Sequence, residues 1–137
     1  MILYNSETTF ILKNKKKITK WINNYVEAKG FSVGEINYIF CGDKYLNTIN
    51  QRFLKHDNYT DIVSFDYSVG KELSGDIFIS IERIIENADT FNVSFNNELH
   101  RVMIHGILHY MGYKDNTTKE KMEMRNAENN CLKLLSS

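Results

Sequence analysis

The sequence contains no proline and only two cysteines, Cys41 and Cys131. The cysteines form no Cys-x-x-Cys motif and are too few for a disulfide framework, so we expect buried free thiols in a reducing compartment. No window approaches the ~20 consecutive apolar residues of a membrane-spanning helix, which argues against a membrane protein. The first ten residues lack the basic and apolar parts of a signal peptide, and we therefore expect a cytoplasmic protein.

The chain has no excess of either charge, because 17 Lys and Arg residues balance 17 Asp and Glu residues. Binding to nucleic acid therefore has to rest on local clusters of cations. One cluster lies at the start of the first expected helix, where positive charges oppose the helix dipole and do not stabilise the helix. A contact with RNA phosphates and a solubilising face are both open roles for its lysines, which are Lys13, Lys15, Lys16, Lys17 and Lys20.

The length of 137 residues fits one domain, which we expect to span residues 1–137. Capping signals and apolar residues at helical spacing predict five helices. Two of them span residues 15–28 and 81–88, and another begins at Asp43. A fourth runs from a cap at Asn96 or Asn97 to Gly112, and the last follows a capping box formed by Thr117 and Glu120. On the last helix the side chains expected to face inward are Met124, Ala127, Cys131, Leu134 and Leu135. Runs of β-branched and aromatic residues predict strands over 35–41, 60–67 and 75–81. Early strands followed by helices indicate an α+β fold with one small sheet.

Near the end of the chain, the segment HGILHYMGYKD (105–115) combines two histidines, a glycine and an aspartate. Positions i and i+4 lie about 40° apart around an α-helix, so His105 and His109 project side by side. Gly112 permits a left-handed turn after the helix, which lets Asp115 approach from another direction. The spacing is that of the metzincin zinc motif with aspartate in the third position. It predicts three protein ligands and an open coordination position, as catalytic zinc sites have.

The alternative for this segment is structural: packed helix histidines, a glycine that ends the helix, and an aspartate in a turn. The common register of these residues favours the metal site. Zinc accepts carboxylate oxygen, so one Zn²⁺ is the expected cofactor, with another divalent metal as the alternative. An anionic ligand lowers the positive charge of the site, which predicts a less acidified metal-bound water than three histidines would give.

The residue after the first histidine is Gly106, where metallopeptidases with a related motif place a glutamate as general base. Glycine offers no base, so peptide hydrolysis by the usual route lacks a component. A phosphodiester is the better substrate, because a metal can polarise a phosphoryl oxygen and generate hydroxide near neutral pH.

With these residues identified, the chain resembles the bacterial YbeY family of rRNA-maturation endoribonucleases. The resemblance runs from about residue 35 to residue 135, through LNTIN, KHDNYTDIVSF, GDIFIS, HGILHYMGYKD and the E…MR…E pattern of the last helix. It implies a zincin-like fold, with helices packed on a small mixed sheet and the metal-binding helix near the C-terminus. It also implies a zinc-dependent, single-strand-specific endoribonuclease in late small-subunit (16S) rRNA maturation and ribosome quality control. The implied partners are rRNA and the ribosomal small subunit, with a ribosomal protein as a further candidate. Binding to a membrane or to DNA is not expected.

Two positions depart from the family's usual pattern: Asp115 replaces a histidine, and Leu54 replaces an arginine. Arg52, Lys55 and His56 are nearby substitutes for that arginine. Arg52 and His56 are the candidate catalytic residues, with His56 as a phosphate contact or as the acid that protonates the leaving oxygen. An exposed loop histidine is the alternative for His56.

Other polar residues have weaker assignments. Asp61 and Ser64 lie on the strand that the resemblance places beside the site, and the favoured role for both is to fix that strand through backbone hydrogen bonds. Asp76 is a candidate partner for a metal-bound imidazole. His100 points to another side of the helix than His105 and is interpreted as structural.

Three other functions stay open at this point. A zincin-type metallopeptidase has the same ligand spacing, but Gly106 argues against it. A ribosome-assembly factor with a structural metal predicts that metal removal unfolds the domain, with no RNA cleavage to be lost. An iron oxygenase with two histidines and one carboxylate ranks last, because nothing else in the sequence indicates an oxidative cosubstrate.

Overall fold

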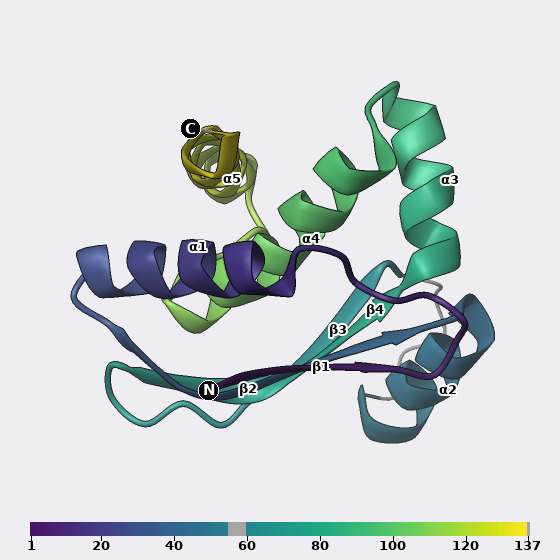
Figure 1. Ribbon diagram of the computed structural model, residues 1–137, viewed down its shortest axis with the longest axis horizontal. Helices are drawn as coiled ribbons and strands as arrows, with labels where there is room; N and C mark the ends of the chain where they lie inside the picture. Colours follow the sequence, from purple (N-terminus) through teal and green to yellow (C-terminus); the bar gives the residue numbers. More distant parts are fainter. Residues whose placement is uncertain (55–59, 137) are drawn as a thin grey trace.

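A four-stranded sheet in the order β1-β2-β4-β3 forms the base of the computed structural model, which describes residues 1–54 and 60–136 (Figure 1). Strands β1, β2 and β4 run parallel, and β3 pairs antiparallel with β4 at one edge of the sheet. The mixed sheet expected from the sequence is therefore confirmed. The strands are β1 (Ile2–Ser6), β2 (Ser32–Cys41), β3 (Ile62–Asp66) and β4 (Glu72–Ser80).

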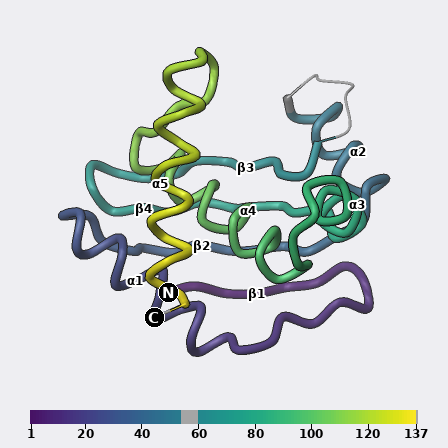
Figure 2. Tube along the Cα trace, turned by 90° about the horizontal axis from the view of Figure 1, so that it is seen from above, coloured from purple at the N-terminus to yellow at the C-terminus, as the bar shows by residue number. Residues whose placement is uncertain are grey.

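The helices form two layers above one face of the sheet and one short layer on the other. Helices α1 (Lys15–Ala28) and α4 (Phe95–Tyr110) lie against the sheet, and α3 (Ile81–Phe91) packs beside α4. Helix α5 (Thr118–Ser136) packs on α1 and α4 farther from the sheet, and Figure 2 shows it running across the strands. Helix α2 (Asp43–Leu54) packs on β3 and β4. None of the described helices is long and apolar enough to cross a membrane.

Alternation along the strands divides the core between the two faces of the sheet. Tyr38 and Ile77 belong to the main cluster under α1 and α4, whereas Leu46 of α2 packs with Val63 in a smaller cluster. Two buried hydrogen bonds join the layers across the main cluster. Tyr38 Oη donates to the carbonyl of Met103 on α4 at 2.8 Å, and Trp21 Nε1 of α1 donates to the carbonyl of Cys131 on α5 at 2.8 Å. The helix that carries the two histidines is thereby fixed to the sheet below it.

Most elements agree with the sequence predictions, and the helix expected over 15–28 has those bounds. The sequence analysis did not predict strand β1, because its five residues form an edge strand in which only Ile2 is buried. The cap of α4 is Ser94, whose Oγ accepts from the backbone N–H of Asn97 at 3.0 Å, so the predicted cap at Asn96 or Asn97 is wrong. A hydroxyl two to three residues before the expected cap supplied an equally good acceptor.

The last helix is confirmed in its start and in most of its buried face. The Thr117 Oγ1 accepts from the backbone N–H of Glu120 at 3.1 Å, and the Glu120 carboxylate accepts from that of Thr117 at 2.9 Å. Met124, Ala127 and Cys131 are buried, but Leu134 is 57% exposed and the prediction for it is wrong. Leu134 borders a hollow between α5 and α1, so most of its side chain stays open to solvent. Leu135 is partly buried against the core.

Both cysteines are buried and unpaired, as the sequence predicted. Burial raises the pKa of Cys41 to about 12 and the pKa of Cys131 to about 11. Both side chains are therefore neutral thiols near neutral pH, and they pack as small apolar groups.

Candidate metal centre

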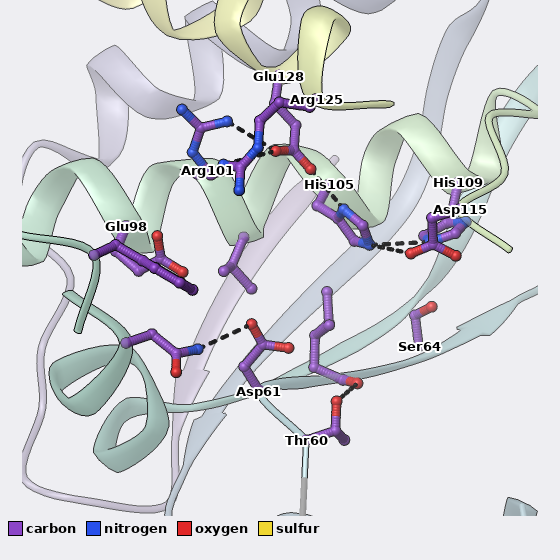
Figure 3. Close-up of a pocket in the computed structure, with 14 residues that line it drawn as sticks. Thr60, Asp61, Ser64, Glu98, Arg101, His105, His109, Asp115, Arg125 and Glu128 are labelled. Atoms are coloured by element: carbon purple, nitrogen blue, oxygen red, sulfur yellow. Dashed lines mark hydrogen bonds and ion pairs between the residues drawn. The ribbon is translucent and has the colours of Figure 1, made fainter. Parts of the chain in front are cut away.

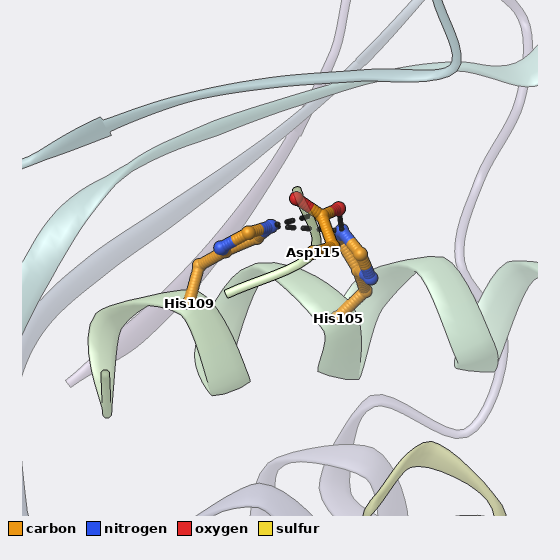
Figure 4. Close-up of side chains that lie close together, drawn as sticks. All are labelled: His105, His109 and Asp115. Carbon is orange, nitrogen blue, oxygen red and sulfur yellow. Dashed lines mark hydrogen bonds and ion pairs between the residues drawn. The ribbon is translucent and has the colours of Figure 1, made fainter. Parts of the chain in front are cut away.

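Three predicted ligands converge at the C-terminal end of α4 (Figure 4). The Nε2 atoms of His105 and His109 lie 3.0 Å apart. The Oδ2 atom of Asp115 lies 3.3 Å from Nε2 of His105 and 3.4 Å from Nε2 of His109. All three side chains are partly exposed, at 20%, 32% and 39% respectively, and all three line one pocket.

A Schellman turn after α4 brings the aspartate back to the histidines. Gly112 has a φ of 104°, a conformation that side chains other than glycine rarely adopt. The backbone N–H of Tyr113 donates to the carbonyl of Leu108 at 3.0 Å, and that of Gly112 donates to the carbonyl of His109 at 3.0 Å. The chain reverses at this turn, so Asp115 arrives opposite the helix face that carries both imidazoles.

The spacing of the three ligand atoms fits a tetrahedral ion. Metal–ligand bonds of 2.0–2.2 Å to nitrogen and oxygen place neighbouring tetrahedral ligands about 3.3–3.6 Å apart. Separations of 3.0, 3.3 and 3.4 Å are close to that range before any metal is bound. Two imidazole nitrogens and one carboxylate oxygen suit zinc and several other divalent ions. With three protein ligands, the fourth tetrahedral position is left open for water or substrate.

Glu128 on α5 orients the first imidazole (Figure 3). Its Oε2 lies 2.7 Å from Nδ1 of His105, and because a carboxylate only accepts, this nitrogen carries the proton. The Nε2 lone pair then faces His109 and Asp115, which is the tautomer that a metal requires. Glu128 is itself held by Arg101, whose guanidinium donates to Oε1 at 2.8 Å.

The charges of this group are coupled. Burial alone would lower the pKa of His105, but the hydrogen bond and charge of Glu128, together with Asp115 and Asp61, outweigh burial and raise it. Burial alone would raise the pKa of Glu128, and its hydrogen bonds to His105 and Arg101 lower it instead. Glu128 is therefore ionised at neutral pH although its side chain is only 7% exposed.

The three ligands open into a pocket of about 460 Å³ between α4, α5, α3 and the edge strand β3 (Figure 3). Its wall carries two further acidic groups, Asp61 before β3 and Glu98 on α4. Burial raises the pKa of Asp61, although the charge that His105 carries when protonated opposes this. Burial, followed by the charge of Asp61, raises the pKa of Glu98. Asp61 also accepts a hydrogen bond from Asn87 at 3.4 Å.

Of the other predicted site residues, some line the pocket and some do not. Ser64 and Asp61 line the pocket, as the placement of their strand beside the site predicted. Arg52 is exposed at the end of α2, with its guanidinium 5.9 Å from the Phe53 ring centroid, and it is not among the described residues that line the pocket. Its catalytic role stays a prediction. His56 lies outside the described residues.

The structure also bears on the weaker assignments of Asp76 and His100. The Asp76 carboxylate accepts from the amide of Asn37 at 3.0 Å across β2 and β4, and Asp76 does not line the pocket, so it is not the partner of an imidazole. His100 packs its ring edge-on against Trp21, with centroids 6.2 Å apart, away from the metal pocket. The structural interpretation of His100 is thereby supported.

Sequence reasoning gave no role to Glu98, Arg101, Arg125 or Glu128, all of which line the pocket. A signal for the first two was present, since Glu98, Arg101, His105 and His109 follow one another at intervals of three and four residues on a mostly apolar helix. Arg125 and Glu128 stand in the E…MR…E pattern of the last helix, but that pattern names no partner, and the partner of Glu128 lies 23 residues away on another helix.

Gly106 faces the sheet and not the pocket. It is buried, and a Cβ at this position would lie 3.0 Å from Cδ1 of Ile77 and 3.3 Å from Cδ1 of Ile62. The glycine lets α4 approach β3 and β4 closely. A glutamate side chain at this position would point into the core, so it could not act in the pocket as the general base of a metallopeptidase.

Comparisons with known proteins find one family over nearly the whole chain. The family model described as endoribonuclease YbeY matches residues 3–136. A relative of that name from Flavobacterium psychrophilum is 52% identical over 134 residues, which cover 98% of this chain and 96% of the relative. Another from Flavobacterium johnsoniae is 53% identical over 128 residues, covering 93% of this chain and 92% of the relative.

The fold has a solved counterpart as well. A solution structure from Thermotoga maritima superposes with a TM-score of 0.70 at 27% identity and covers 98% of this chain and 89% of that chain. The fold expected from the sequence is thereby confirmed. Together with the family match over nearly the whole length, it shows that this chain belongs to the YbeY family of endoribonucleases.

Proposed function

We propose that the chain is a zinc-dependent endoribonuclease that cuts single-stranded RNA. Its substrate is the rRNA of the small ribosomal subunit, in late 16S maturation and ribosome quality control. The observation that carries the catalytic part is the convergence of three ligand atoms within 3.4 Å of one another in an open pocket of a YbeY-family chain. The ribosomal partners, including a ribosomal protein, rest on the family resemblance.

The chain's own residues supply the ligands and their orientation. His105, His109 and Asp115 would hold the ion, and Glu128 keeps the imidazole of His105 in the tautomer that binds. A bound zinc ion supplies a Lewis acid for a phosphoryl oxygen and lowers the pKa of water. The three protein ligands leave room for the substrate beside them.

The walls of the pocket support a single strand as substrate. The ligands lie between α4, α5 and β3, and the side chain of His105 is only 20% exposed. A flexible strand can turn one phosphodiester into such a recess, whereas a phosphodiester in a duplex is held on a stiff, wide helix. Cleavage of peptides is disfavoured, because Gly106 is buried against the sheet and supplies no base.

A substrate panel tests this function. Zinc-loaded protein is incubated with a single-stranded RNA, the same RNA in a duplex, single-stranded DNA of the same sequence, and casein. We expect cleavage of the single-stranded RNA alone, and loss of that cleavage on metal removal while the circular dichroism spectrum stays folded. Cleavage of casein and not RNA would support the metallopeptidase. Unfolding on metal removal, with no RNA cleavage at any stage, would support an assembly factor with a structural metal.

A further inference from the structure

We propose that Arg125 and Lys121 of α5 form a phosphate-binding subsite beside the metal centre. The subsite takes the RNA phosphate next to the one that is cleaved. This inference rests on the proposed endoribonuclease function, and it assigns a substrate contact that the ligand set itself does not supply.

Position is the first argument. Arg125 lines the metal pocket, and Figure 3 shows it descending from α5 beside Glu128 and above His105. It also lines an adjoining hollow of about 270 Å³, whose other lining residues are His105, Asp115, Lys121, Met124 and Glu128. Lys121 lies one helical turn before Arg125, so the two cations project from the same face of α5. The hollow thus joins two cations to two of the metal ligands.

Availability is the second argument. The Arg125 side chain is 55% exposed, and its one ion pair in the described part of the chain is a long contact of 3.8 Å to Glu128. Lys121 is exposed and forms no ion pair with any described residue. Arg101 differs on both counts: it is 16% exposed and donates to Glu128 and to Asn129 at 2.8 Å each. Arg101 therefore holds Glu128, and Arg125 is free to bind a substrate phosphate.

The charge of the pocket is the third argument. Asp61, Glu98, Asp115 and Glu128 all line it, so its wall repels a polyanion such as RNA. Arg101 is paired with Glu128, so its positive charge is already neutralised. A guanidinium with open donors at the rim offsets the repulsion and fixes the strand through charge-assisted hydrogen bonds to phosphate. The subsite should therefore act on substrate binding more than on the chemical step.

A single neutral linkage in the substrate tests the subsite. The substrates are single-stranded RNAs with a mapped cleavage site, each with one methylphosphonate at one of the two linkages next to that site. The ribose at the modified linkage carries a 2′-O-methyl group. The reference RNA has the same 2′-O-methyl group and an ordinary phosphodiester. Wild-type protein, Arg125→Gln and Lys121→Gln are compared, with Lys119→Gln as the control. Lys119 is an exposed lysine of the same helix that lines neither cavity.

We expect Arg125→Gln to bind metal normally and to lose roughly tenfold in kcat/KM, mainly through KM. Lys121→Gln loses less, because a lysine binds phosphate as a point charge. On wild-type protein the methylphosphonate at one neighbouring linkage causes a similar tenfold loss. In Arg125→Gln the same linkage has no further effect, because the contact is already gone.

Three results would overturn the subsite. In the first, the losses in kcat/KM from Arg125→Gln and from the neutral linkage multiply. In the second, Arg125→Gln cleaves RNA as well as wild type does. In the third, Lys119→Gln loses as much kcat/KM as Arg125→Gln. Each is observed with a wild-type protein that does cleave RNA, so the endoribonuclease function itself would stand. A wild-type protein that cleaves none of the RNAs would overturn both.

Discussion

The Nδ1 atom of His105 on α4 lies 2.7 Å from the carboxylate of Glu128 on α5. This contact joins the metal-binding helix to the last helix. Arg101, also on α4, donates to the other carboxylate oxygen of Glu128 at 2.8 Å and keeps the carboxylate in place. The proposed metal centre would thus depend on a residue that is not one of its three candidate ligands. Ligand basicity and ring orientation are both set by this partner.

Replacing Glu128 by glutamine should weaken metal binding by about 10- to 100-fold. The amide is a weaker acceptor for the Nδ1 proton and cannot neutralise Arg101. Competition with a zinc chelator of known affinity measures the change. Glu123→Gln removes an exposed carboxylate from the same helix and serves as the control. Equal zinc affinity in wild type and Glu128→Gln would show that the contact is only structural.

Replacing Asp115 by histidine should move the pH–activity profile toward acid. The carboxylate contributes a negative charge at 3.3–3.4 Å from the two imidazoles, and a neutral imidazole in its place leaves more positive charge on the centre. Initial rates of RNA cleavage from pH 5 to pH 9 test this. A wild-type rate that is already maximal in mildly acid solution, with no shift in the variant, would contradict the argument.

Gly106 should tolerate alanine and reject glutamate. The new Cβ meets the ends of Ile77 and Ile62 at 3.0 and 3.3 Å, a packing cost of about 1–3 kcal/mol that about 1 kcal/mol of helix propensity partly offsets. Glutamate brings a charge into the core and should lower the free energy of unfolding by about 4 kcal/mol or more. Urea denaturation measures both. A stable Gly106→Glu protein with peptidase activity would contradict this packing and revive the metallopeptidase.

His100 should make the fold less stable in mild acid. Burial lowers the pKa of His100 below its usual range, and the charge of Lys17 lowers it further. The unfolded chain therefore binds more protons, and stability falls as the pH drops through the unfolded value of about 6.5. His100→Gln should lose less stability than wild type between pH 7.5 and pH 5.5 in urea denaturation. The other histidines are present in both proteins, so equal losses would mean that His100 does not contribute.

The sequence predicted those features that depend on local spacing. The ligand set followed from the i, i+4 geometry of His105 and His109 and the turn at Gly112, and the start of α5 from the capping box of Thr117 and Glu120. Features that depend on packing between distant segments were not predictable. Glu128 reaches His105 from another helix, and strand β1 owes its place to pairing with β2 more than to its own residues.

The most direct measurement is zinc content and single-stranded RNA cleavage, made in parallel on wild-type protein and on His109→Ala. His109 is partly exposed, so its truncation should leave the fold intact by circular dichroism. We predict one zinc per chain and RNA cleavage for the wild type, with both lost in the folded variant. One zinc per chain without cleavage by either protein would contradict a catalytic metal. Wild-type protein without any bound metal would contradict the metal centre itself.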